Sequence, residues 1–142
     1  MAAYWYIANA KLKFEGVEDM PPIDKELWRG VVENDNELFW FENTSHGNNY
    51  FSDPYASEED LKSLRRTLAH MDINRKIGHG QVQFNYNNKT GHIPITHTRE
   101  TLNRIEKYYK IANKLNAKLF KNGTWINEKQ LDIFKVKYAK KK

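Results

Sequence analysis

The strongest constraint in the sequence is an apolar repeat at helical spacing that extends from about Thr98 to Lys121. The apolar residues fall on one face of a helix, and they are Leu102, Ile105, Tyr109, Ala112, Leu115 and Leu119. Lysines recur at the same spacing on the nearly opposite face, at Lys107, Lys110, Lys114, Lys118 and Lys121. Thr98 can cap the start, and Asn122-Gly123 is typical of a helix end. We therefore predict one long helix with a core face and a cationic face.

Strand alternation and helix caps predict the remaining elements. Alternating apolar residues predict strands over residues 4–14, 82–86 and 92–97. Apolar segments on either side of the polar turn Asn34-Asp35-Asn36 predict a hairpin with strands over residues 27–33 and 38–43. Capping signals predict two further helices, over residues 57–71 and from Asn127 through Leu131 and Phe134. Most of the strands are expected to pair as antiparallel hairpins. The sequence therefore predicts an α+β fold, in which hairpins form a sheet packed by two or three helices, the longest near the C-terminus.

The length and composition limit the class of protein. At 142 residues the chain is expected to form a single domain spanning residues 1–142. It contains no long apolar run and no basic segment followed by an apolar one, so we expect neither a membrane span nor a signal peptide. Cysteine is absent, which excludes disulfides and fits a cytoplasmic location.

Charge is distributed unevenly along the chain. Residues 1–60, the strand-rich half, hold 4 Lys/Arg against 13 Asp/Glu, a net charge of −9. Residues 61–142, with the helices and the second hairpin, hold 19 against 5, a net charge of +14, and end in a basic tail at residues 137–142. Such asymmetry indicates a polyanionic partner for the basic half. The alternative is that the two halves neutralise each other within one fold.

The first predicted strand also indicates self-association. Its even-numbered positions look buried throughout, yet Trp5 and Ile7 on the odd face are apolar too. An apolar patch on a second face needs cover, and large exposed patches usually mark interfaces. We therefore expect a homodimer or a higher oligomer.

The sequence offers little that would support catalysis. His92 and His97 lie five residues apart on one strand, so they point to opposite faces, and we expect neither a metal site nor a cofactor. No nucleophile motif and no phosphate-binding glycine loop occurs. His79 and His92 flank the second hairpin and are weak candidates for acid–base cleavage of a phosphodiester.

The remaining signal is a set of basic residues interleaved with aromatic ones. Aromatic rings can stack on bases while Lys and Arg contact phosphates. The candidate ligand-binding residues are Phe84, Tyr86, Asn88, Lys89, Arg99, Arg104, Lys107, Trp28, Arg29 and Trp125. They predict a non-catalytic binding protein for a phosphate-bearing ligand, which is RNA, DNA or a nucleotide.

Two other functions stay open on the sequence alone. One is a small metal-independent phosphodiesterase or nuclease that uses the histidines. The other is a protein-binding inhibitor whose acidic half meets a basic partner, with a phage as one candidate source. The abundance of Lys and Asn fits an AT-rich genome, such as that of a low-GC bacterium or its phage.

Overall fold

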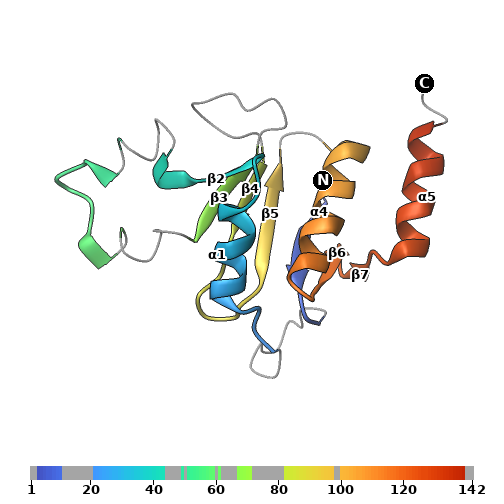
Figure 1. Ribbon diagram of the computed structural model, residues 1–142, viewed down its shortest axis with the longest axis horizontal. Coiled ribbons are helices and arrows are strands. Elements are labelled where there is room, and N and C mark those ends of the chain that lie inside the picture. Colours follow the sequence, from blue (N-terminus) through green and yellow to red (C-terminus); the bar gives the residue numbers. More distant parts are fainter. Residues whose placement is uncertain are drawn as a thin grey trace.

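The centre of the molecule is a seven-stranded antiparallel sheet in the order β2-β3-β4-β5-β1-β6-β7 (Figure 1). The computed structural model describes residues 3–10, 21–43, 49, 51–59, 61, 67–71, 82–97 and 100–139. The strands are β1 (Trp5–Ala8), β2 (Leu38–Trp40), β3 (Leu68–Met71), β4 (Val82–Asn85), β5 (Ile93–His97), β6 (Lys118–Lys121) and β7 (Thr124–Trp125). The predicted α+β class is confirmed.

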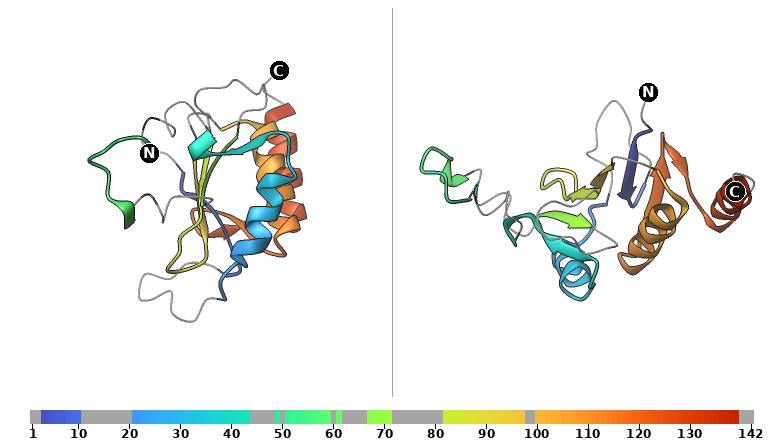
Figure 2. Two further views of the ribbon diagram at one scale, coloured as in Figure 1. Left: turned by 60° about the vertical axis from the view of Figure 1, so that its left-hand side comes forward. Right: turned by 90° about the horizontal axis from the view of Figure 1, so that it is seen from above.

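The main helices cover one face of this sheet. They are α1 (Lys25–Glu33), α4 (Leu102–Lys114) and α5 (Glu128–Ala139), and a short 3-10 turn, η1 (Phe41–Asn43), follows β2. Figure 2 shows the sheet on edge with these helices on the same side. None of the described helices is both long enough and apolar enough to cross a membrane.

The core lies between the helices and the sheet, and aromatic rings fill much of it. Trp5 contacts the Tyr108 ring of α4 at a centroid distance of 5.9 Å and the Phe134 ring of α5 at 6.0 Å. Trp28 of α1 contacts Phe84 at 6.0 Å. Burial of such large rings contributes most of the apolar stabilisation that a chain with so many aromatic residues can gain.

Trp5 and Ile7 therefore do not form an exposed patch. Both are fully buried, and they face the helix layer of their own chain. The even-numbered Tyr6 and Ala8 lie on the other sheet face, where Tyr6 stacks on Phe120 with an interplanar angle of 11°. A homo-oligomer remains a prediction, but the patch that motivated it is covered by α4 and α5.

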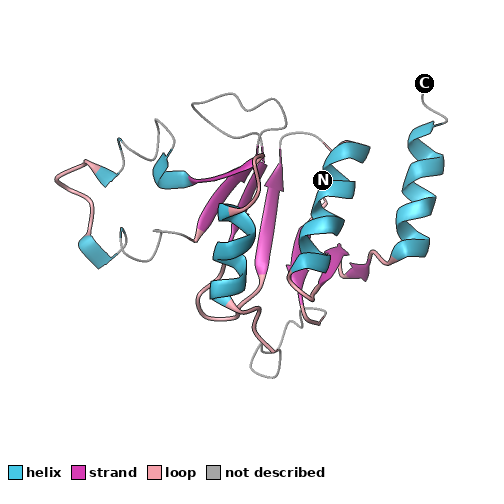
Figure 3. Ribbon diagram, in the orientation of Figure 1, coloured by secondary structure: helices cyan, strands magenta, loops and turns pink. Residues whose placement is uncertain are grey.

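The strand predicted over residues 27–33 is wrong, because this segment lies within α1 (Figure 3). The Asp24 side chain caps the helix by accepting a hydrogen bond from the Glu26 amide at 2.9 Å. Trp28, Val31 and Val32 then share one buried face at helical spacing. An apolar segment this short does not by itself distinguish a strand from a helix, and the cap together with packing on the sheet selects the helix.

The helix predicted over residues 57–71 is wrong at its end. Leu68–Met71 forms β3, in which Ala69 pairs with Trp40 on one side and with Phe84 on the other. Pairing along both edges satisfies the backbone of these residues, and this gain overrides a helical spacing of leucines. Residues 62–66 lie outside the described residues.

The long helix predicted from Thr98 to Lys121 is also too long. Its cap is Thr101, and α4 ends at Lys114. Asn116 has a left-handed φ of 54°, and the Ala117 amide donates to the Ala112 carbonyl at 2.9 Å, which closes the helix. The chain then enters β6, so Lys118 and Lys121 belong to a strand.

Other boundaries shift as well. β1 covers only the start of the strand predicted over residues 4–14, and residues 11–20 lie outside the described part of the chain. β2 gives way to η1 within the strand predicted over residues 38–43. The last helix, α5, continues to Ala139, into the segment predicted to be a basic tail.

Candidate functional site

The predicted ligand-binding residues do not form a single surface. Tyr86, Asn88 and Lys89 lie around the β4–β5 turn, at the start of β5, whereas Arg104 and Lys107 lie on α4, which follows the end of β5 (Figure 1). The length of β5, about 16 Å for its five residues, separates the two groups. Arg99 and His79 lie outside the described residues.

Two of the candidate rings belong to the core. Phe84 and Trp28 are fully buried and pack against each other, and the Trp28 indole donates to the Thr67 carbonyl at 3.3 Å. Neither ring has a face open to a base. Their aromatic character is explained by packing between α1 and the sheet.

The β4–β5 turn is braced from within. The buried Tyr86 hydroxyl donates to the Ile23 carbonyl at 2.7 Å, and burial raises the pKa of this phenol. Lys25 donates to the Asn88 side chain at 2.8 Å, and its ammonium lies 5.9 Å from the Tyr86 ring centroid. Lys89 is exposed. The Lys89 side chain at this turn is therefore open to solvent, but the ring of Tyr86 is buried and its hydroxyl is already bonded.

The predicted ligand-binding cations Arg29 of α1 and Lys107 of α4 have acidic partners within the chain. Arg29 pairs with Glu26 at 2.8 Å, and Arg104 is buried. Lys107 contacts Asp35 at 2.6 Å and Glu37 at 2.8 Å. Burial opposes ionisation of Asp35, but its hydrogen bond with Lys107 prevails and lowers the pKa of this carboxyl. At Lys107, two carboxylates of the acidic half therefore neutralise a cation of the basic half within one fold.

His92 is the weak catalytic candidate that the structure describes. It is buried, its ring lies edge-on to Tyr6, and its Nδ1 contacts the Thr90 hydroxyl. Burial lowers the pKa of this imidazole, which favours the neutral form. Among the described residues, no group of three His, Asp or Glu side chains could hold a metal ion.

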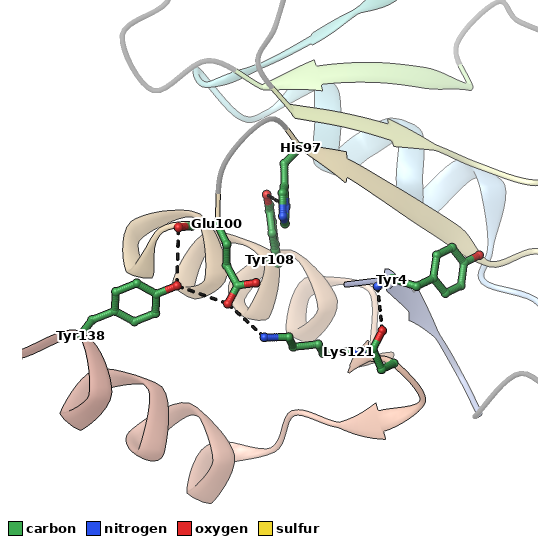
Figure 4. Close-up of polar contacts among 7 residues, drawn as sticks. Tyr4, His97, Glu100, Tyr108, Lys121 and Tyr138 are labelled. Atoms are coloured by element: carbon green, nitrogen blue, oxygen red, sulfur yellow. Dashed lines mark hydrogen bonds and ion pairs between the residues drawn. The ribbon is translucent and has the colours of Figure 1, made fainter. Parts of the chain in front are cut away.

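A titratable cluster that the sequence analysis missed joins α5 to the rest of the fold. In Figure 4, Glu100 lies between Lys121 of β6 and Tyr138 of α5. The Glu100 carboxylate accepts from the Lys121 ammonium at 3.1 Å and from the Tyr138 hydroxyl at 3.2 Å. Burial opposes ionisation of Glu100, but the bond from Lys121 and its charge prevail, so the pKa is lowered.

His97 and Tyr108 lie beside this cluster, with 3.1 Å between the imidazole Nδ1 and the phenol oxygen. Burial lowers the pKa of His97 and raises that of Tyr108. Both groups are therefore neutral near pH 7 and bond to each other. The contacts of Glu100 with Lys121 and Tyr138 hold α5 against the rest of the fold. The members of the cluster are distant in sequence and meet only in the folded chain.

Trp125 is the candidate aromatic residue that keeps an open ring. It is 47% exposed, whereas Trp5, Trp28 and Trp40 are buried. The Lys118 ammonium lies 4.7 Å from the Trp125 ring centroid. Because β7 is the last strand in the sheet order, this pair lies at the sheet edge.

A pocket of about 140 Å³ adjoins Trp125. Its lining comes from the end of α4, from β6 and β7, and from the start of α5, and includes Tyr109, Asn113, Lys118, Trp125 and Asn127. We call these five residues the Trp125 surface. They combine aromatic rings, amide groups and a cation, the groups that recognise bases and phosphates.

Further exposed cations lie on the helices that contribute to the Trp125 surface. Lys110, Lys114 and Lys129 are exposed, and each is next in sequence to a residue that lines the pocket. Within the described ranges, these three lysines have no acidic partner within ion-pair distance, and the same holds for Lys118. Glu128 is the acidic residue among the lining side chains.

Comparisons with protein-family models, with curated proteins and with solved structures found no match for this chain.

Proposed function

We propose that this protein is a non-catalytic binder of a phosphate-bearing ligand, RNA, DNA or a nucleotide, and that the ligand contacts the Trp125 surface. One observation carries the proposal: a half-exposed indole with an ammonium 4.7 Å from its ring centre and no acidic partner for that ammonium in the described part of the chain. The indole can stack on a base, and the ammonium can pair with a phosphate.

Magnitudes favour exchange of the lysine for a base. An exposed cation–π contact contributes about 0.5–1 kcal/mol. Stacking of a base on an aromatic side chain contributes roughly 1–3 kcal/mol. A base can therefore displace the Lys118 ammonium from Trp125, and the displaced ammonium gains a phosphate partner in exchange.

The test is a binding titration with labelled RNA, labelled DNA and a panel of nucleotides, at about 50 mM salt where charge contacts are strong. We expect Trp125→Ala to weaken binding by roughly 1–3 kcal/mol without lowering stability, since the ring is half exposed. Tyr55→Ala is the matched control, because Tyr55 is 95% exposed and lies away from the pocket lining. It should leave binding unchanged.

Failure of every nucleic acid and nucleotide to bind would remove the proposal. That result would favour the protein-inhibitor alternative, in which the acidic residues meet a basic protein. Cleavage of a bound RNA or DNA in the presence of EDTA would instead favour the histidine-based nuclease.

A further inference from the structure

We infer that the ligand is a single-stranded nucleic acid and that one unpaired pyrimidine base occupies the pocket beside Trp125. The inference rests on the proposed function and narrows it to one substrate class. Three observations support it: the open indole, the size of the pocket, and the lysine that lines it together with the exposed lysines on the same elements.

The open indole requires an unpaired base. In a duplex each base is stacked on both faces inside the helix, so neither face can reach a protein ring unless the base is extruded. Trp125 lies on a two-residue edge strand, and its ring is open in the free protein. A single strand can present a base to such a ring without any cost of unpairing.

The pocket fits one small ring and excludes the rest of a nucleotide. Its volume is about 140 Å³, and a cavity of about 150 Å³ binds benzene. A site that encloses a whole small ligand usually measures about 300–1,000 Å³. A pyrimidine base therefore fits, and its sugar and phosphate must lie outside the pocket.

Amide groups in the lining can contact the edge of the base. The Asn127 side-chain oxygen accepts from the Gln130 amide at 2.9 Å, which caps α5 and fixes this side chain. Its NH₂ group is left as a hydrogen-bond donor. Asn113 adds a second amide from α4. Donors and acceptors at these positions match the polar edge of a pyrimidine.

The lysines suit a chain of phosphates better than a single one. Lys118 of β6 lines the pocket, and the exposed Lys129 of α5 follows the lining residue Glu128, whereas Lys110 and Lys114 share the α4 face of Lys107. A strand that leaves the pocket past Lys118 and Lys129 and continues across α4 can contact three or four of these lysines. In a plot of log affinity against log salt concentration, each phosphate contact on a single strand makes the negative slope steeper by about 0.7.

The decisive experiment uses the fluorescence of Trp125. The other tryptophans are buried, so quenching by acrylamide reports chiefly on Trp125. The probes are a twenty-residue oligothymidylate, an oligoadenylate of equal length, the duplex of the two, and thymidine monophosphate. We expect oligothymidylate to protect Trp125 from acrylamide and to bind at least about tenfold more tightly than the other probes.

Raising salt from 50 to 200 mM should weaken oligothymidylate binding by about 20- to 50-fold, as three or four phosphate contacts predict. Trp125→Ala should weaken this binding by about 5- to 150-fold, and the control Tyr55→Ala should not change it. Equal binding of the duplex, or tight binding of thymidine monophosphate with little salt dependence, would overturn the single-strand inference but keep the proposed function. Equal binding of oligoadenylate would overturn the pyrimidine pocket. Failure of all four probes to bind would defeat the proposed function itself.

Discussion

Lys107 offers the sharpest test of how the two oppositely charged halves fit together. Its ammonium bonds to Asp35 and Glu37, more than sixty residues away in sequence. The side chains of Lys107 and Asp35 are only 17% and 6% exposed. Lys107→Met keeps the aliphatic chain but removes the charge, and it leaves the Asp35 carboxylate largely out of water.

The expected loss of stability lies between two limits. Breaking a fully buried ion pair by removing one partner costs roughly 3–5 kcal/mol, and an exposed pair contributes at most about 1 kcal/mol. In the variant, Asp35 keeps a hydrogen bond from the Glu37 amide at 2.9 Å, and this bond reduces the loss of stability. We therefore expect Lys107→Met to lower the free energy of unfolding by about 2–3 kcal/mol, measured by urea unfolding.

The pH dependence gives an independent check. Because the pKa of Asp35 is lowered in the folded state, the ion pair stabilises the fold above the pKa of the unfolded carboxyl, which is about 3.9. This stabilisation is lost as the pH falls through the lower pKa of the folded state. The difference between wild type and Lys107→Met should therefore shrink on acidification below about pH 4.

Lys110→Met is the control, since Lys110 is exposed on the same helix. It should cost less than about 0.5 kcal/mol. Equal losses in the two variants, or a Lys107→Met difference that stays constant from pH 7 to pH 3, would refute this account of the pair. Lys107 would then be an ordinary surface lysine that remains available to a ligand.

Two other predictions concern packing. Ile105→Ala should cost roughly 2–5 kcal/mol in urea unfolding because Ile105 is fully buried, whereas Lys114→Ala, at an exposed position, should cost less than about 0.5 kcal/mol. Tyr138→Phe should cost about 0.5–1.5 kcal/mol, because it removes the donor to Glu100, and hydrogen exchange should show faster opening of α5. Unchanged exchange in Tyr138→Phe would mean that the rings alone hold this helix.

The sequence predicted the elements whose patterns are local and strong. The second hairpin is correct because apolar and polar residues alternate on both sides of the turn, and β4 pairs with β5 as expected. The segment 27–33 was predicted wrongly because an apolar segment this short, next to a polar turn, does not by itself distinguish a strand from a helix. β3 failed because pairing with β2 and β4 decides its conformation, and no local pattern shows that pairing.

The candidate site was only partly visible in the sequence for a related reason. Trp125 was named, but Lys118 was placed in a helix, so the contact between them could not be foreseen. The pairing of Lys107 with Glu37 could not be foreseen, because the two residues are distant in sequence. Glu100, Lys121 and Tyr138 carried no motif at all. Charge pairing and clustering depend on the fold, and a single sequence shows only spacing.

The end of α4 is the point at which the sequence interpretation and the structure can be set against each other directly. Asn116 has a φ of 54°, a left-handed conformation that costs most residues with a Cβ roughly 1–2 kcal/mol but that Asn tolerates better. Asn116→Ala should therefore destabilise the protein by about 1 kcal/mol, and Asn116→Gly should be neutral or stabilising. Asn113→Ala, at an exposed position within the same helix, should be neutral or stabilising, since Ala favours helices more than Asn does. If both alanine variants instead stabilise the protein equally in urea unfolding, the helix continues through residue 116, and the original interpretation of one helix to Lys121 would stand.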